Sequence, residues 1–272
     1  MKTKILNKIL LMQFAVISIT FAGCSKEQSI TTPKDSIPVI PGYTLVWNDE
    51  FENANIDLTK WEHEVNGDGG GNNELQFYTA STSNSFIENG SLVIQAIKEN
   101  YQNKEYTSAR LRTAHKGDWK YGRFDIRAKL PYGQGLWPAI WMLPTDWVYG
   151  GWPESGEIDI MELLGQQPYK VYGTIHYGTS ANHQSNGASY QLPSSTFSAD
   201  YHLFTVEWDS TGIRWYVDGN KYHTENHGQP FDQRFHLLLN VAVGGNWPGS
   251  PDATTTFPQK MYVDYVRVYK KD

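Results

Sequence analysis

The chain has 272 residues, a formal net charge of −6 and a single cysteine. An acidic chain is a poor partner for nucleic acid, and one cysteine cannot form an internal disulfide. The length suffices for one large β domain or two small ones, and no internal repeat divides it.

The first 23 residues are typical of an export signal. Three lysines, Lys2, Lys4 and Lys8, precede a mostly apolar run from Ile9 to Gly23. This run is too short to span a bilayer core, which needs about 20 apolar residues. We therefore expect cleavage, a mature protein without a transmembrane helix, and a mature net charge of about −9, because the signal removes three lysines and no acid.

The end of the signal resembles the lipobox at which bacterial lipoproteins are cleaved and acylated, because Phe21-Ala22-Gly23 stands directly before Cys24. We expect residues 1–23 to be a lipoprotein signal peptide and Cys24 to carry the lipid anchor. The alternative is ordinary cleavage that leaves an idle thiol. Ser25-Lys26-Glu27 lacks the aspartate associated with inner-membrane retention, so we expect an exported protein anchored in the outer membrane of a Gram-negative bacterium.

Residues 24–42 are rich in Ser, Thr, Lys, Gln and Pro and are too polar to bury a core, so they are predicted to form a tether. A single globular domain is predicted over residues 43–272. Its clearest pattern has period two: Phe124, Ile126, Ala128 and Leu130 alternate with Arg123, Asp125, Arg127 and Lys129. Such alternation predicts a half-buried strand.

Similar strands are predicted at residues 92–97, 204–208, 213–217 and 261–269, with hairpin turns at residues 210–212 and 218–220. The chain also contains 24 glycines and 13 prolines and has no long segment of helical periodicity. These patterns predict an all-β protein, a β-jelly-roll sandwich of two stacked antiparallel sheets.

Three acids lie on one predicted strand, in the sequence Glu157-Ile-Asp159-Ile-Met-Glu162. Glu157 and Asp159 share a strand face, with Ile158 on the other face, in the core. Strict alternation would bury Glu162 in that core, where an unpaired carboxylate costs several kcal/mol. We therefore predict a β-bulge near Met161 that returns Glu162 to the face of the other two acids.

With this bulge the carboxyl groups of Glu157 and Glu162 can approach to about 5 Å, which suits retaining glycoside hydrolysis, whereas inversion needs about 6.5 to 9.5 Å. Asp159 adds a third charge, and crowded anions keep one carboxyl protonated to serve as an acid near neutral pH. The alternative is that three acids on an exposed strand face are simply solvated.

Further motifs accompany this strand, in chain order NNELQFYT at 72–79, GLWPAIWMLP at 135–144, TIHYG at 174–178, WYVDG at 215–219 and LNVAVGGNWPG at 239–249. Together with residues 157–162 they resemble glycoside hydrolase family 16, in its bacterial laminarinase branch. The resemblance covers essentially residues 43–270, so it extends over the whole predicted domain.

The resemblance implies a jelly roll with a long concave cleft, in which Glu157 is the nucleophile, Glu162 the general acid/base and Asp159 an electrostatic helper. It implies a retaining endo-β-glucanase that hydrolyses β-1,3-glucan of the laminarin type and extends to mixed-linkage β-1,3-1,4-glucan. Two alternatives stay open: a non-catalytic surface protein that binds glycans, and a transglycosylase on the same fold.

One segment departs from the family pattern. Many laminarinases have a Trp-Gly pair where this chain has Gly70-Gly71. An aromatic wall of the cleft is therefore expected to be missing, which bears on the width of the subsites and on mixed-linkage or decorated glucans.

Glycan clefts pair flat aromatic rings with hydrogen-bonding groups, and ten tryptophans supply candidates. The predicted substrate-binding residues are Asn72, Glu74, Arg110, Trp137, Trp141 and His176. Trp137 and Trp141 are an even number of residues apart and are expected on the open face, and His176 is expected to contact substrate or the acids. The residues expected in the core are Trp47, Trp61, Trp208 and Trp215. Ordinary loop, strand-face or structural roles remain the alternatives for Asn72, Glu74, Arg110 and His176.

The predicted catalysis needs no metal, and no His/Cys cluster has the spacing of a zinc site. The resemblance implies a structural Ca²⁺ bound by the carbonyls of Glu50 and Gly90 and the carboxylate of Asp264, all oxygen ligands that suit a hard cation. The alternative for Asp264 is a plain surface residue. We expect a monomer whose partners are β-glucan and, through the anchor, a membrane.

Overall fold

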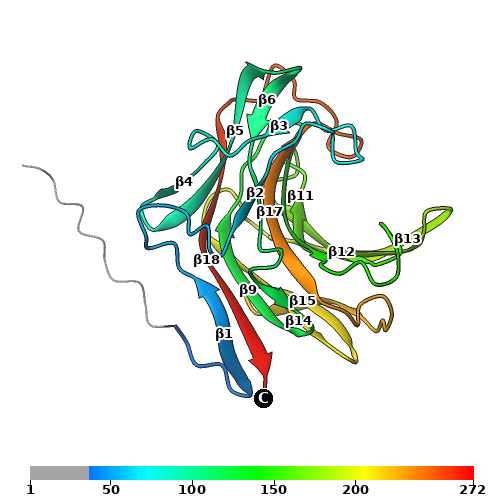
Figure 1. The fold of residues 1–272 in the computed structure, drawn as a ribbon. Helices are drawn as coiled ribbons and strands as arrows, with labels where there is room; N and C mark the ends of the chain where they lie inside the picture. The colour runs from blue at the N-terminus through cyan, green and yellow to red at the C-terminus, as the bar shows by residue number, and fades with distance from the viewer. Residues whose placement is uncertain (1–36) are drawn as a thin grey trace, which may run out of the picture. The chain divides into compact units, whose positions relative to one another are not determined.

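The computed structural model describes residues 37–272, so the predicted signal peptide, Cys24 and most of the tether lie outside the described residues. Eighteen strands make up the secondary structure of this part of the chain (Figure 1). No helix in it is long and apolar enough to cross a membrane. The all-β prediction is confirmed.

The strands form two sheets (Figure 1). The ten-stranded sheet has the order β16 (Asn220–Glu225), β15 (Gly212–Val217), β14 (His202–Asp209), β9 (Gly122–Lys129), β18 (Gln259–Lys271), β5 (Ser91–Tyr101), β6 (Lys104–Ser108) and β3 (Gln76–Tyr78), with β1 (Tyr43–Asp49) paired to β18 and β4 (Ser85–Glu88) paired to β5. The eight-stranded sheet has the order β13 (Asn182–Gln191), β12 (Lys170–Thr179), β11 (Glu157–Leu163), β10 (Leu136–Pro144), β17 (Phe235–Val243), β7 (Arg110–Arg112) and β2 (Glu62–Glu64), with β8 (Asp118–Trp119) paired to β17.

The strand pairings are antiparallel with one exception. The three-residue strand β3 runs parallel to β6. The exception corrects the fully antiparallel prediction. It arises because β3 enters the sheet edge from the loop before it and is not joined to β6 by a hairpin.

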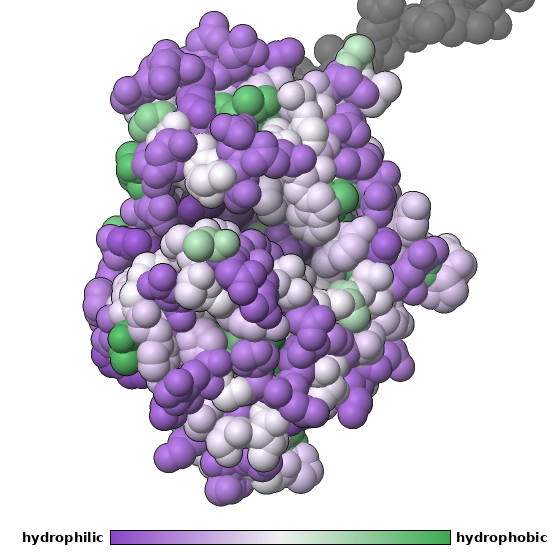
Figure 2. Space-filling model, turned by 90° about the vertical axis from the view of Figure 1, so that its right-hand side faces the viewer, coloured by the Kyte–Doolittle hydropathy of each residue, from purple (hydrophilic) through white to green (hydrophobic). Residues whose placement is uncertain are grey.

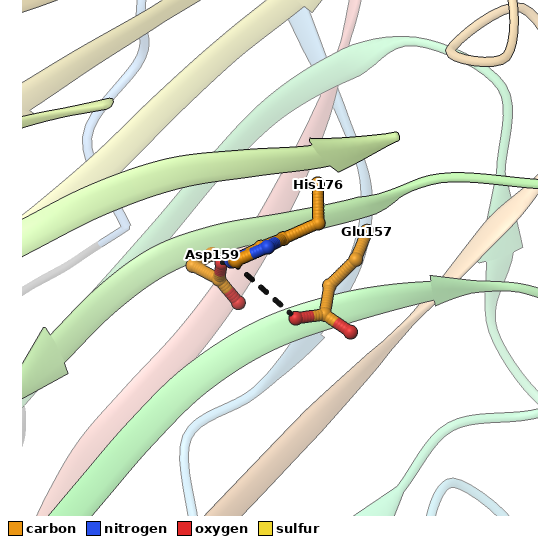
Figure 3. Close-up of side chains that lie close together, drawn as sticks. All are labelled: Glu157, Asp159 and His176. Atoms are coloured by element: carbon orange, nitrogen blue, oxygen red, sulfur yellow. Dashed lines mark ion pairs between the residues drawn. The ribbon is translucent and has the colours of Figure 1, made fainter. Parts of the chain in front are cut away.

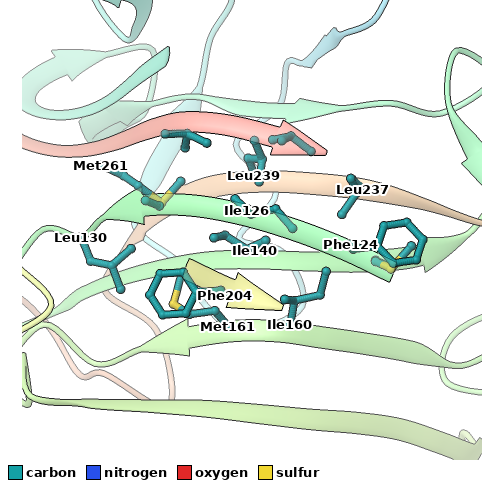
Figure 4. Close-up of a cluster of buried hydrophobic side chains, with 14 of the residues drawn as sticks. Phe124, Ile126, Leu130, Ile140, Ile160, Met161, Phe204, Leu237, Leu239 and Met261 are labelled. Carbon is teal, nitrogen blue, oxygen red and sulfur yellow. The ribbon is translucent and has the colours of Figure 1, made fainter. Parts of the chain in front are cut away.

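A single core fills the space between the sheets. Figure 4 shows Phe124 and Ile126 of β9 packed with Ile140 of β10, Ile160 of β11 and Leu237 of β17. The period-two prediction for β9 is confirmed, because Phe124, Ile126, Ala128 and Leu130 are at most 2% exposed. Each large apolar side chain removed from water in this way contributes about 1.5–3 kcal/mol.

The tryptophans expected in the core are found there. Trp61, Trp208 and Trp215 are at most 2% exposed, and Trp47 is partly buried and packs edge-on against Trp61. The predicted turns at residues 210–212 and 218–220 do connect hairpin strands, β14 with β15 and β15 with β16.

Candidate active site

The outer face of the eight-stranded sheet holds a cleft of about 320 Å³. Its floor comes from β2, β7, β17, β10 and β11, and its walls from residues 68–72 and from the loop between β10 and β11. Figure 2 shows this side of the molecule hollowed across its middle. All three predicted catalytic acids line the cleft.

The strand β11 carries the predicted bulge. Asp159 pairs with Thr174 and Glu162 with Tyr172, so three steps along β11 match two steps along β12. Ile160 and Met161 are the two bulge residues, and both are buried in the core. The extra residue lets two apolar side chains face inward while Glu162 returns to the cleft.

Gly156 turns the chain into β11 just before Glu157. Its φ is +83°, and a Cβ there would lie 3.0 Å from the ring atoms of Pro230 and Phe231. Only glycine combines this backbone conformation with such a close approach. This local constraint fixes where the carboxylate strand begins.

Asp159 and Glu162 are buried and Glu157 is half-buried, which excludes the alternative of a plain exposed acidic face. Asp159 is 2% and Glu162 8% exposed, and the side chain of Glu157 is 16% exposed. Each reacting glutamate accepts a hydrogen bond from an indole: Trp152 Nε1 donates to Glu157 Oε2 and Trp137 Nε1 donates to Glu162 Oε1, both at 2.9 Å.

Burial makes all three acids hard to ionise. It raises the pKa of Glu162 to about 8, with the charge of Asp159 adding to the effect. It also raises the pKa of Asp159, and it raises that of Glu157 well above its usual range, again with a contribution from Asp159. A positive charge on His176 lowers the pKa of both glutamates and so partly offsets this rise. Burial and crowding therefore favour the protonated form of all three carboxyls, and a charge on His176 favours ionisation of the two glutamates.

His176 contacts the acids, as expected. Its Nε2 lies 3.2 Å from Asp159 Oδ2 and 3.9 Å from Glu157 Oε1 (Figure 3). It comes from β12, where it pairs with Glu157 in register. Trp137 and Trp141 of β10 both line the cleft, so both lie on the open face, as their even spacing predicts.

Glu74 and Arg110 form the floor of the cleft and are buried, at 4% and 8% exposed. Arg110 Nη2 lies 3.6 Å from Glu74 Oε2, and its guanidinium packs 4.4 Å from the ring of Tyr78 and 5.2 Å from that of Trp141. Arg110 therefore lines the cleft and also stabilises the positions of the Tyr78 and Trp141 rings through cation–π contacts.

Asn72 lines the wall at the predicted glycine segment. Gly70 has φ +57°, and a Cβ there would lie 2.5 Å from Glu74 Oε1. A side chain at Gly71, by contrast, would meet nothing within 4 Å. At Gly70 and Gly71 the wall is therefore made of backbone and carries no aromatic ring, as the departure from the Trp-Gly pattern predicts.

Several cleft residues were not among the predicted ones. Trp147 and Trp152 come from the loop between β10 and β11, and Asn240 of β17 accepts a hydrogen bond from Trp141 Nε1 at 2.7 Å. Asn240 could have been found, because it is a polar residue within the otherwise apolar run from Leu237 to Val243. The loop tryptophans carry no periodic signal that would place them.

Within residues 37–272, Glu157, Asp159 and His176 bring one possible metal-ligand atom each within 4.8 Å of one another, and all three belong to the catalytic cluster. The residues implied for calcium lie elsewhere and do not line the cleft. Glu50 follows β1 and Gly90 precedes β5, and both strands pair with β18 on either side of Asp264. The register thus places Glu50 and Gly90 at the strand ends that flank the position of Asp264 in β18.

The fold and the site together define a glycoside hydrolase: two glutamates share one strand face inside a cleft lined by aromatic rings.

The sequence matches the family model of Glycosyl hydrolases family 16 over residues 72–267. It is 44% identical over 286 residues to a beta-glucanase of Rhodothermus marinus, covering 97% of this chain and 96% of that protein. It is 44% identical over 277 residues to glucan endo-1,3-beta-glucosidase A1 of Niallia circulans, covering 90% of this chain and 40% of that protein. The solved laminarinase catalytic domain of Thermotoga maritima matches with a TM-score of 0.79 and 47% identity, covering 85% of this chain and 99% of that one. The chain belongs to glycosyl hydrolases family 16.

Proposed function

We propose that this chain is a retaining endo-β-1,3-glucanase that hydrolyses laminarin-type glucan, with Glu157 as nucleophile, Glu162 as general acid/base and Asp159 as electrostatic helper. The observation that carries the proposal is the bulge of β11, which brings both glutamates to the cleft face. The substrate is supported by the names of the similar proteins, a glucan endo-1,3-beta-glucosidase and a laminarinase.

Each glutamate is suited to one role. Glu162, with a pKa of about 8, holds its proton at neutral pH and can give it to the glycosidic oxygen as the bond to the anomeric carbon breaks. Burial and the charge of Asp159 disfavour ionisation of Glu157, whereas the Trp152 hydrogen bond and a charge on His176 favour it. The ionised Glu157 attacks that carbon. Glu162, now ionised, then takes a proton from the water that hydrolyses the glycosyl-enzyme.

Trp137, Trp141, Trp147 and Trp152 offer apolar ring faces along the cleft to the C–H faces of glucose units. We propose that mixed-linkage β-1,3-1,4-glucan is also cut. The cleft wall carries no side chain at Gly70 or Gly71, so it lacks the ring of the family's Trp-Gly pair and leaves more room on that side.

Incubation of the purified protein with laminarin, lichenan, xyloglucan and agarose tests the proposal. We expect short oligosaccharides from laminarin, slower cleavage of lichenan and no product from agarose. Nuclear magnetic resonance should detect the β-anomer first, because a double displacement retains configuration. Agarose cleaved faster than laminarin, or the α-anomer as first product, would contradict the proposal. Assays at high acceptor concentration separate hydrolysis from transglycosylation.

We further propose that a structural Ca²⁺ binds at the carbonyls of Glu50 and Gly90 and the carboxylate of Asp264. The donors are the oxygen ligands that Ca²⁺ prefers, and the strand register supports their proximity. Arg127 already pairs with Asp264 Oδ2 at 2.8 Å, so the ion would share this carboxylate with a guanidinium.

We also propose that the protein is exported as a monomer and held in an outer membrane by acylated Cys24, a residue outside the described part of the chain. A lipoprotein N-terminus carries several acyl chains, enough for stable anchoring. The native protein should partition into detergent, and Cys24→Ala should release it or stall its maturation. Unchanged membrane association of the variant would refute the anchor.

A further inference from the structure

His183 lies beside the active site, in a part of the chain that none of the recognised motifs includes. It belongs to β13, the outermost strand of the cleft sheet, and pairs with Gly178 of β12. Its Nε2 lies 2.9 Å from His176 Nδ1, and the two imidazole rings stack with their centroids 5.1 Å apart and an interplanar angle of 16°. The two rings therefore share one proton across a hydrogen bond.

The other nitrogen of His176 faces the reacting acids. Its Nε2 is 3.2 Å from Asp159 Oδ2, a buried oxygen that accepts no hydrogen bond within residues 37–272 (Figure 3). An ionised carboxylate in this position needs an N–H or a positive charge opposite it. A bare nitrogen lone pair at Nε2 would instead repel Asp159.

His183 influences which of these forms His176 adopts, because it is the hydrogen-bond partner of Nδ1. A neutral imidazole has one N–H, whereas an imidazolium has two. When His183 Nε2 accepts a hydrogen bond from Nδ1–H of a protonated His176, Nε2–H of His176 faces Asp159. When His183 donates to a neutral His176, the proton of His176 is again left on Nε2. Both arrangements place a proton on Nε2, close to Asp159 Oδ2 although not aligned for a hydrogen bond to it. A neutral His176 that donates from Nδ1 to His183 would leave Nε2 bare, and the charge of an ionised Asp159 disfavours that third form.

His183 also touches the second group that holds the nucleophile. Its ring centroid lies 4.8 Å from that of Trp152, whose Nε1 donates to Glu157 Oε2. One side chain thus contacts both residues that approach Glu157 from outside β11.

We propose that His183 is a positioning residue, which holds the His176 ring beside Asp159 and Glu157 with a proton on Nε2 and thereby favours the ionised nucleophile. This inference rests on the proposed function, in which Glu157 attacks the sugar.

The charges around the pair support this role. The titratable groups that face His176 are Glu157, Asp159 and Glu162 of β11 and His183 of β13. Burial and the charge of His176 hold the pKa of His183 below its usual range, so His183 stays neutral and can accept from His176. Protonated His176 in turn opposes the rise that burial and Asp159 impose on the pKa of Glu157.

The test compares His183→Phe, which keeps an aromatic ring beside Trp152, with His183→Gln, which keeps a hydrogen-bond acceptor. Loss of the acceptor disfavours protonated His176, so Glu157 should ionise at higher pH. In His183→Phe the acidic limb of kcat/KM on laminarin should move up by about 0.5 to 1 pH unit, and activity at pH 5 should fall about 3- to 10-fold. His183→Gln should restore most of the profile.

The control is Gln184→Ala, an exposed residue of the same strand, which should leave the profile unchanged. Nitrogen-15 spectra of His176 give a second readout that needs no substrate: His183→Phe should change its Nδ1 signal and His183→Gln should not. An acidic limb and a His176 signal that are both unaltered in His183→Phe would overturn the inference. If the wild type fails to cleave laminarin, the proposed function fails, while the His176 spectra still decide whether His183 positions that ring.

Discussion

Burial of Glu157, Asp159 and Glu162 is the feature from which their chemistry follows. A carboxylate removed from water resists ionisation, and a neighbouring anion resists it further. Trp137 and Trp152 supply one donor to each glutamate, which fixes the orientation of the carboxyl groups without supplying a charge. Burial therefore favours a protonated carboxyl at Glu162, and ionisation of Glu157 depends on the positive charge that His176 can bring beside it.

Substitution of the three acids should separate their roles. Glu157→Ser should abolish laminarin hydrolysis yet transfer α-glucosyl fluoride to an acceptor, because this donor mimics the glycosyl-enzyme. Glu162→Ala should lose about 10²- to 10⁴-fold on laminarin, the usual contribution of a general acid, and keep activity on activated aryl glucosides, with recovery by azide. Asp159→Asn should fall between them. Azide rescue of Glu157→Ser instead, with retention of configuration, would exchange the roles.

The raised pKa of Glu162 also predicts a cost in stability. Its protonated form contributes stability below about pH 4.5, the unperturbed value, and this contribution is lost as the pH rises toward 8. Glu162→Gln should therefore match the wild type near pH 4.5 and exceed it by about 2 to 4 kcal/mol at pH 9, measured by urea unfolding. The exposed Glu105→Gln is the control. A stability difference that does not grow with pH would contradict the raised pKa.

At the scale of the element, the bulge of β11 depends on a residue of the opposite sheet. Trp215 of β15 is fully buried and donates from Nε1 to the carbonyl of Asp159 at 2.8 Å. That carbonyl lies at the start of the bulge, where the register between β11 and β12 shifts. A core tryptophan therefore also stabilises the backbone that orients Glu162.

Trp215→Phe should lower both the free energy of unfolding and the turnover. Loss of the donor and of side-chain volume should cost about 2 to 4 kcal/mol, and a displaced carboxylate should lower kcat at least about 10-fold. The matched control is Trp208→Phe, since Trp208 is also buried and donates to the Phe231 carbonyl at 2.9 Å. Trp208→Phe should lose stability but keep kcat. Equal losses of kcat in both variants would contradict a specific role for Trp215.

At the scale of the molecule, the two sheets have different roles. The eight-stranded sheet carries the cleft on its outer face, and the ten-stranded sheet covers its inner face and holds the residues proposed for calcium. The proposed ion would join the ends of β1 and β5 to β18, away from the reacting groups. Its effect should therefore be on stability and not on chemistry.

Chelation of calcium should lower the melting temperature and leave kcat at 25 °C unchanged. An ion at about 1,000 times its Kd contributes about 4 kcal/mol, and each kcal/mol shifts the Tm of a domain this large by about 2–4 °C. Scanning calorimetry with and without Ca²⁺ measures this shift. Asp264→Asn should remove the response, and Asp200→Asn, an exposed acid in a loop, should keep it. A Tm independent of Ca²⁺ would contradict the site.

The sequence by itself determined the sheet class, the inward face of β9 and the bulge of β11, because each follows from local periodicity. The cost of burying Glu162 was sufficient to predict the extra residue at Ile160 and Met161. Even spacing placed Trp137 in the cleft and the resemblance added Asn72, and both line it.

Only the tertiary structure decided which distant residues meet at the acids. Trp152 enters from a loop without periodicity and Asn240 from β17. Trp215 comes from the opposite sheet, and His183 from the edge strand β13. Period two assigns a residue to a face but not to a neighbour, because strand order and register depend on how the whole chain pairs. The burial that raises the pKa of Glu162 is likewise a property of both sheets together.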